Sequence, residues 1–342
     1  MIIGATDVEF EFIHGASRRR FLIQGATSLA FASFVAKAHG MPPQQQSAGI
    51  SGTTTLGSTM SSVTTVTDVA QRLTINVRID GQGPYRFLVD TGADRTVVAT
   101  EVAADLGLIA GERVMLEGVV RAVAAETVSV RELSFGSVRC RDLVVPILPA
   151  SMLEADGYLG LDVLDNHRVT LDFKNHTLQV GDSRSRLSTF WVRPKETRIR
   201  ATGSSGHLRA VNCTVDGISA TAFVDTGGEL SAGNSALLTA LVNRDPRYKA
   251  IGTILLSGVT GGAITGSAAP IQKIQLRELE ITDCTLVIAD FQVFNVWGLR
   301  EHPAVLIGMN FLRRFSKVSI DYGLKELRFD LAHLGLVSLQ ST

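Results

Sequence analysis

The sequence predicts an all-β protein made of two similar lobes related by pseudo-two-fold symmetry, with a cleft between them. Composition supports this class: Gly accounts for 32 of 342 residues and aromatic side chains for only 6%, a balance typical of short strands joined by many turns. The stronger observation is an internal repeat. The stretch "NVRIDGQGPYRFLVDTG" (Asn76 to Gly92) aligns with "NCTVDGISATAFVDTG" (Asn212 to Gly227) with one residue of gap.

Each copy of the repeat predicts a β-hairpin. Asp-Gly lies between alternating apolar residues, which is a hairpin signal, and the second strand then ends in Asp-Thr-Gly. The repeat returns further on, where "YLGLDVL" (158–164) matches "LIGMNFL" (306–312). The stretches "VTLDFKNHTLQV" (169–180) and "VSIDYGLKELRF" (318–329) then match without a gap and predict a further hairpin in each copy.

The two copies set the lobe boundaries. We expect an N-terminal lobe over 66–182, a charged linker broken by Pro194 over 183–196, and a C-terminal lobe over 197–335. The interval from Asp90 to Gly160 spans 70 positions and that from Asp225 to Gly308 spans 83. The second lobe therefore carries about 13 extra residues, expected near 243–249 or 291–304.

The first 38 residues resemble a signal peptide. Arg18, Arg19 and Arg20 precede an apolar stretch that ends near Val35, and a small-x-small site follows. "SRRRFL" is similar to the twin-arginine export signal, which implies a bacterial periplasmic or secreted protein. An uncleaved anchor or amphipathic tail is the alternative. The apolar stretch is shorter than the roughly 20 residues of a membrane helix, so no stable span is expected after cleavage. Residues 39–65, rich in Ser, Thr, Gly and Gln, predict a flexible spacer.

Charge and cysteine content exclude several classes. Lys+Arg and Asp+Glu both number 33, so nothing indicates a nucleic-acid partner. The three cysteines (Cys140, Cys213, Cys284) have no metal-type spacing and are expected to be buried thiols. The seven His form no HExxH pattern. We therefore expect neither a metal nor a cofactor.

The two DTG triplets are equivalent points of the two predicted lobes. One triplet alone is more often a turn that closes a strand, but the pair recurs at matching places in a repeated unit. A two-fold relation between the lobes would bring like surfaces together. Asp90 and Asp225 would then meet at the axis.

These residues resemble the retropepsin-like branch of the aspartic peptidases. "DTGADRTVV" from Asp90 is close to the retroviral form of the motif, and "YLGLDVL" and "LIGMNFL" look like that family's second signature. The resemblance covers about residues 65–332. It implies two β-barrel lobes, each providing one DTG. Both halves lie in one chain, so the resemblance implies activity as a monomer on a peptide or protein substrate.

The resemblance assigns roles to six residues. Asp90 and Asp225 would be catalytic, the hydroxyls of Thr91 and Thr226 would bond across the lobe interface, and Gly92 and Gly227 would form tight turns. Two carboxylates about 3 Å apart cannot both ionise, so they share one proton. The ionised member would take a proton from a water molecule and the protonated member would support the carbonyl oxygen.

Each lobe is expected to send a flap over the cleft. In the first lobe the candidate is 114–123, with Gly118 near its tip. In the second it is 256–266, where Gly258, Gly261 and Gly262 permit a mobile hairpin. Neither candidate contains the Tyr that pepsins place in their single flap, which favours the two-flap retroviral arrangement.

Further substrate-binding candidates follow each DTG: Ala93 and Asp94 in the first lobe, Gly228 and Glu229 in the second. Ala93 and Gly228 offer no hydroxyl to stabilise an ionised dyad, so we expect a weakly acidic optimum. Retroviral enzymes pair the residue at Asp94 with an Arg after the signature Gly, but those positions here are Leu161 and Met309. Asp94 must find another partner, such as an arginine elsewhere, or stay solvated.

The sequence also predicts two helix caps and leaves two alternative functions open. Asp162 and Asn310, in the second signature, are expected to cap the short helices there. A catalytically silent peptide-binding envelope protein could share the fold, although both DTG triplets are intact. A β-rich envelope structural protein would explain the export signal but not the paired motifs.

Overall fold

The computed structural model describes residues 4–5, 8–14, 17–23, 60–64, 66–67, 73–183, 196–202, 207–331 and 337–339. Residues 6–59 form one unit and the remainder of the chain another. In the smaller unit, β2 (Val8–His14) pairs antiparallel with β3 (Ser17–Ile23). Apart from residues 4–5, the rest of the predicted signal peptide lies outside the described residues, so export stays a prediction. Within the described part, no helix is long and apolar enough to span a membrane.

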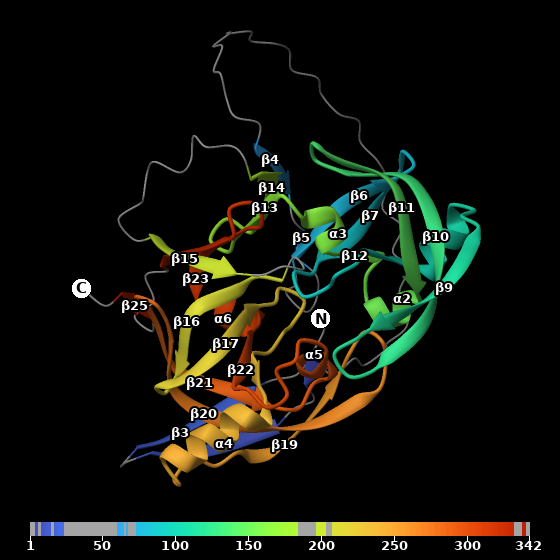
Figure 1. The fold of residues 1–342 in the computed structure, drawn as a ribbon. Coiled ribbons are helices and arrows are strands. Elements are labelled where there is room, and N and C mark those ends of the chain that lie inside the picture. The colour runs from blue at the N-terminus through green and yellow to red at the C-terminus, as the bar shows by residue number, and fades with distance from the viewer. Residues whose placement is uncertain are drawn as a thin grey trace, which may run out of the picture. The chain divides into compact units, whose positions relative to one another are not determined.

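The larger unit confirms the predicted all-β class, with two closed six-stranded barrels. Figure 1 shows the strands of the first lobe in cyan and green and those of the second in yellow to red. Elements of the first lobe are β6 (Leu73–Ile79), β7 (Gln82–Val89), β8 (Val97–Ala99), α1 (Thr100–Asp105), β9 (Ala110–Glu117), β10 (Ala122–Phe135), β11 (Val138–Leu148), α2 (Ala150–Leu153), β12 (Gly157–Leu159) and α3 (Leu161–Leu164).

The second lobe repeats this order. Its elements are β16 (Arg209–Val215), β17 (Ile218–Val224), β18 (Ala232–Gly233), α4 (Ser235–Arg244), β19 (Ile251–Ser257), β20 (Ala263–Leu276), β21 (Leu279–Ile288), α5 (Gln292–Val296), β22 (Ala304–Ile307) and α6 (Met309–Leu312). Short strands β5 (Val66–Thr67), β25 (Val337–Leu339) and β1 (Gly4–Ala5) pair with β6, β21 and β19.

The predicted hairpins form for the reason the sequence indicates. The turn residues Asp80 and Gly81 both have positive φ, and so do Asp216 and Gly217 in the second lobe. This backbone matches the twist of a two-residue hairpin turn. Along β6 the apolar side chains of Ile75, Val77 and Ile79 are buried, whereas the residues between them are exposed.

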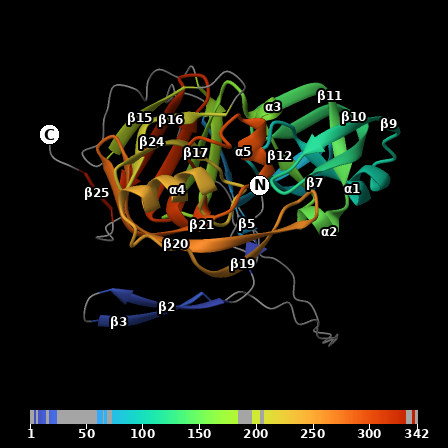
Figure 2. The ribbon, with the colours of Figure 1, turned by 60° about the horizontal axis from the view of Figure 1, so that its bottom comes forward.

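The extra length of the second lobe lies at both predicted places. Helix α4 has ten residues where α1 has six. Residues 289–303 join β21 to β22, whereas the shorter segment 149–156 joins β11 to β12. The longer connection contains α5. Helix α4 lies against the strands of its lobe (Figure 2) and buries Leu237 and Leu241.

A six-stranded segment, continuous with the second lobe's strands through the pairing of β15 (Glu196–Thr202) with β16, joins the lobes. Its strands follow the order β15, β24 (Glu326–Leu331), β23 (Phe315–Asp321), β13 (His167–Asp172), β14 (Thr177–Asp182) and β4 (Met60–Thr64). At its centre β13 pairs antiparallel with β23, and Thr170 faces Ser319 with their hydroxyl oxygens 2.9 Å apart. The pseudo-two-fold axis therefore passes through this sheet.

The predicted spacer is wrong at its end. Residues 60–64 form strand β4, which pairs with β14. Their Ser and Thr content favoured a spacer, but an added edge strand is stabilised by main-chain hydrogen bonds that composition does not reveal. Most of the predicted linker, 184–195, lies outside the described residues.

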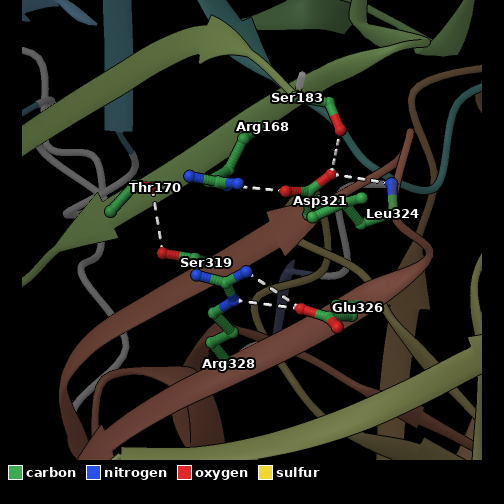
Figure 3. Close-up of polar contacts among 8 residues, drawn as sticks. All are labelled: Arg168, Thr170, Ser183, Ser319, Asp321, Leu324, Glu326 and Arg328. Carbon is green, nitrogen blue, oxygen red and sulfur yellow. Dashed lines mark hydrogen bonds and ion pairs between the residues drawn. The ribbon is translucent and has the colours of Figure 1, made fainter. Parts of the chain in front are cut away.

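Two ion pairs, one of them buried, join β13 to β23 in this sheet. Arg168 Nε donates to Asp321 Oδ2 over 2.6 Å, with side chains 3% and 0% exposed. Figure 3 shows that Asp321 also accepts from the Ser183 hydroxyl and the Leu324 amide. The repeat places Lys317 and Asp172 at the symmetry-related positions, where they pair over 2.9 Å.

Candidate active site

The two strands that end in DTG deliver the two aspartates to equivalent places. Strand β7 runs parallel to β12, and β17 runs parallel to β22. Each pairing continues for one more bond, so that Asp90 N–H donates to Leu159 O and Asp225 N–H donates to Ile307 O, both over 3.0 Å. Both aspartate residues are only 1% exposed. The sheet thus fixes the backbone of each aspartate.

The glycines of both triplets turn their amides onto the carboxylates. Gly92 N–H donates to Asp90 Oδ1 over 2.8 Å, and Gly227 N–H donates to Asp225 Oδ1 over 2.9 Å. Gly228 N–H adds a third bond, to Asp225 Oδ1 over 3.2 Å. These donors restrict how each carboxyl group can rotate.

The DTG loops of the two lobes touch. A Cβ atom on Gly92 would lie 2.8 Å from Asp225 Oδ1 and 3.1 Å from its Oδ2. Real Cβ atoms do not approach so closely, so only glycine permits this contact. Gly92 of the first lobe therefore lies directly against the carboxyl group of the second.

The two threonines form a reciprocal set of hydrogen bonds. Thr91 N–H donates to Thr226 Oγ1 over 3.1 Å, and Thr226 N–H donates to Thr91 Oγ1 over 3.0 Å. Each hydroxyl then donates to a carbonyl of the other lobe, Thr91 to Val224 O over 3.1 Å and Thr226 to Val89 O over 2.7 Å. All four groups are buried, and the pattern is the same from either lobe. The loops are thereby locked to each other beneath the carboxylates.

Burial raises the pKa of Asp225 to about 6, and the negative charge of the neighbouring Asp90 adds to the rise. The hydrogen bonds from the Gly227 and Gly228 amides favour the charged form and oppose it. Burial beside Asp90 therefore favours the protonated form of Asp225 in weak acid.

This shift predicts a pH-dependent stability. In the unfolded chain an Asp carboxyl titrates near pH 3.9, so between about pH 4 and 6 only the folded protein binds the proton at Asp225. Folding stability should fall as the pH rises through this window, by roughly 3 kcal/mol in all. Urea unfolding of the protein and of Asp225→Asn across pH 4–7 measures this. Parallel curves for the two proteins would contradict the assignment.

Two further residues per lobe hold the loop that follows each DTG. Asp162 Oδ1 accepts from the amide and hydroxyl of Thr96, over 2.8 and 2.7 Å. Asn310 Oδ1 accepts from the amide and hydroxyl of Ser231 in the same way, over 2.9 and 2.7 Å. The predicted helix caps are therefore wrong. Gly160 and Gly308 occupy the cap positions without side-chain bonds, and both polar side chains instead bind the neighbouring loop.

Ala93 and Gly228 use their main chains inside the protein. Ala93 O accepts from Leu161 N–H over 2.9 Å, and Gly228 O accepts from Met309 N–H over 2.8 Å. These bonds attach the second signature to the DTG loop in each lobe.

Asp94 and Glu229 have different partners, so the two ends of the site are not equivalent. Glu229 makes two bonds to the guanidinium of Arg313, of 2.7 and 3.2 Å. Asp94 Oδ1 lies 2.8 Å from Nε2 of His207, and its side chain is 68% exposed. His207 packs against Trp297, with ring centroids 5.0 Å apart. Asp94 thus pairs with an imidazole rather than an arginine and also stays solvated.

Sequence reasoning missed these partners for different reasons. Arg313 lies five residues after the signature Gly308, and a search confined to the next position overlooks it. His207 comes from the segment before β16 and crosses from the second lobe to Asp94 of the first. No local pattern marks such a contact.

The predicted flaps are both hairpins. Residues 118–121 turn between β9 and β10, with Gly118 N–H bonded to Arg121 O over 3.1 Å. Residues 258–262 turn between β19 and β20, where Gly261 and Gly262 have φ of +74° and +81°. Gly258 faces Val120 of the other turn, and a Cβ atom on Gly118 would overlap Thr260 Oγ1. The four glycines therefore lie where the two tips meet.

Tyr322 is a further residue that the sequence did not single out. It follows β23, at the position that Phe173 occupies after β13. Its hydroxyl is buried and makes no hydrogen bond within the described residues. Burial raises its pKa, and the negative charge of Asp90 adds to the rise. The two lobes therefore differ at this position.

The remaining candidate groups are the three cysteine thiols and the side chains that could bind a metal ion. Cys213 and Cys284 are buried free thiols, and burial raises the pKa of each to about 12. Cys140 is only partly buried, which corrects the prediction of three buried thiols. Within the described ranges, no group of three or more His, Cys, Asp or Glu side chains could hold a metal ion.

Comparison with known proteins identifies the class. A family model for aspartyl proteases matches residues 75–163 and again residues 211–311, together more than half of the chain. Each matched region contains one DTG and all but the last residue of the second signature that follows it. The chain therefore belongs to the aspartyl protease family, as the sequence predicted. No curated protein matches it.

Proposed function

We propose that the protein is an active aspartic endopeptidase whose single chain supplies both catalytic residues, Asp90 and Asp225. The reciprocal bonding of Thr91 and Thr226 carries this proposal. Four buried hydrogen bonds across the lobe interface hold the two DTG loops together. Each of these loops carries one carboxylate. A protein that only needed the fold would have no use for two carboxylates so placed, because burial makes them costly.

The geometry supports direct attack by water. A water molecule held between the carboxylates gives its proton to the ionised member of the pair as it attacks the peptide carbonyl. Burial raises the pKa of Asp225 to about 6, so the pair retains a proton in weak acid, and the protonated member donates a hydrogen bond to the carbonyl oxygen as that atom gains charge. No acyl-enzyme forms, because both carboxylates act on protons only.

The two flaps complete the cleft. Their tips meet each other, and we infer that they cover the DTG loops in the two-flap arrangement that the sequence favoured, with a peptide lying extended between tips and dyad. The different partners of Asp94 and Glu229 make the two directions along the cleft chemically distinct. We infer that a substrate binds in one preferred direction.

Cleavage of a mixed peptide library by the full chain, from pH 3 to 8, tests this function. We expect cuts that are strongest in weak acid and fall off above about pH 6, where Asp225 loses its proton. A statine-type transition-state mimic should block them. The double variant Asp90→Asn with Asp225→Asn, purified in parallel, controls for contaminating proteases. A maximum near pH 2 would contradict the role given to Asp225. Binding of the mimic without cleavage at any pH would favour the silent peptide-binding alternative.

A further inference from the structure

The tip of the first flap contacts two separate elements of the second lobe. Arg121 Nε donates to Thr260 O over 3.0 Å, and Thr260 Oγ1 donates back to Arg121 O over 2.7 Å. Independently, the amide of Gln292 donates to Val119 O over 2.7 Å. Val119 and Thr260 are 4% and 1% exposed. Figures 1 and 2 show the β19–β20 hairpin extending toward the first lobe, and Figure 1 shows α5 beside the β9–β10 tip.

The second contact comes from the insertion that distinguishes the lobes. Gln292 is the first residue of α5, within the longer connection 289–303. This connection is firmly attached to its own lobe, since Phe291 and Phe294 are each 1% exposed. The Asn234 amide also donates to Leu299 O and His302 O, over 2.8 and 2.7 Å. Helix α5 thus presents its first amide from a rigid base.

The second flap is built differently at its tip. Gly261 and Gly262 both have positive φ, which only glycine adopts readily, and Gly258 precedes them. Its bonds to the first flap run through side chains of Arg121 and Thr260. The first flap is also held at its turn by a main-chain bond to a packed helix, whereas the main-chain pairing of the second flap with β1 lies outside its turn, at Leu256 and Ser257.

We propose that α5 positions the first flap over the dyad through the Gln292 amide, so that this flap is the fixed wall of the cleft and the second flap is the part that opens. Peptide would enter by breaking the Arg121–Thr260 bonds while the Gln292–Val119 bond persists. The catalytic meaning of this arrangement rests on the proposed peptidase function, but the arrangement itself can be tested without turnover.

The variant Gln292→Pro removes this one donor. Proline is well tolerated at the first position of a helix, and Phe291 has φ −63° and ψ 143°, an extended conformation suited to a residue before proline. Gln292→Ala is the matched control, because it changes the same side chain but keeps the N–H. One hydrogen bond contributes about 0.5–1.5 kcal/mol, so amide exchange over 114–123 should rise up to about tenfold in Gln292→Pro and stay unchanged in Gln292→Ala. Equal exchange in the two variants would overturn the proposal.

A second variant keeps the test decisive if proline disturbs folding. Thr260→Val removes the hydroxyl donor but not the bond from α5. We expect faster exchange over 256–266 and unchanged exchange over 114–123. If both flaps loosen equally, the first flap is not independently held and the proposal fails.

Steady-state kinetics distinguish a positioning role of α5 from a general loss of structure. Loss of a flap contact that substrate and transition state share should raise KM and leave kcat nearly unchanged. Gln292→Pro should therefore show a KM effect of up to about tenfold with the pH profile of the unmodified enzyme. A fall in kcat with unchanged KM would place α5 in the chemistry instead. If the protein cleaves nothing, the peptidase function fails while the exchange experiment still decides the role of α5.

Discussion

Asp225→Asn should lower kcat/KM by roughly 10⁴-fold without unfolding the protein. The amide cannot exchange the proton that the dyad needs, and general acid–base groups of this kind contribute about 10²–10⁴-fold. The side-chain oxygen can still accept from the Gly227 and Gly228 amides, which now bond to Asp225 Oδ1. Stability near neutral pH should rise, because a buried carboxyl is replaced by a neutral group. Steady-state kinetics at pH 5 and urea unfolding at pH 7 measure the two effects.

Asp162→Asn is the matched control for this substitution. Asp162 lies near the same loops, and the second lobe already carries Asn310 in its place, with the same two bonds to its neighbouring loop. We expect this variant to keep most of the activity. A similar loss in both variants would mean that the region tolerates no change, and the effect at Asp225 would then say nothing about catalysis.

Asp321→Ala should be among the most destabilising single substitutions in the larger unit. Asp321 is fully buried in the sheet that joins the lobes and accepts from Arg168, Ser183 and Leu324. Without the carboxylate, the guanidinium of Arg168 loses its buried counter-charge, which costs about 3–5 kcal/mol. Urea unfolding at pH 7 measures the loss, and Asp321→Asn gives a milder variant if the Ala protein does not fold.

The symmetry-related pair provides the control. Asp172→Ala breaks the ion pair with Lys317, whose side chain is 28% exposed. The freed ammonium can reach water, so this loss should be smaller, about 1.5–3 kcal/mol. Burial alone would raise the pKa of Asp172, but hydrogen bonds from Lys317 and Asn175 lower it overall. Equal losses at the two aspartates would show that burial of the cationic partner does not set the cost.

The repeat in the sequence predicted most of the fold. Equal patterns at Asn76 and Asn212 predicted matching hairpins, and both DTG triplets lie at the ends of their second strands as expected. These features are local, because alternation of apolar residues and turn chemistry act over a few positions. The hairpins predicted as flaps form for the same reason, since glycines between strand-like runs predict hairpins.

The missed features depend on contacts between distant parts of the chain. His207 reaches Asp94 across the lobes, and the Gln292 amide reaches Val119. Tyr322 differs from its counterpart Phe173 by one hydroxyl, and the sequence does not show that this hydroxyl is buried. The local sequence favoured helix caps at Asp162 and Asn310, but these side chains instead accept hydrogen bonds from Thr96 and Ser231. Tertiary hydrogen bonds of this kind leave no periodic trace in a sequence.

One chain of this protein should form one complete aspartic site. Active-site titration with a tight statine-type mimic tests it most directly, with the protein present as full chains of known concentration. We predict one mimic bound per chain for the unmodified protein, with catalysis lost in step with binding, and sharply weakened binding in both Asp90→Asn and Asp225→Asn. One mimic per two chains would mean that two molecules build the site. Binding that neither substitution weakens would place the site elsewhere.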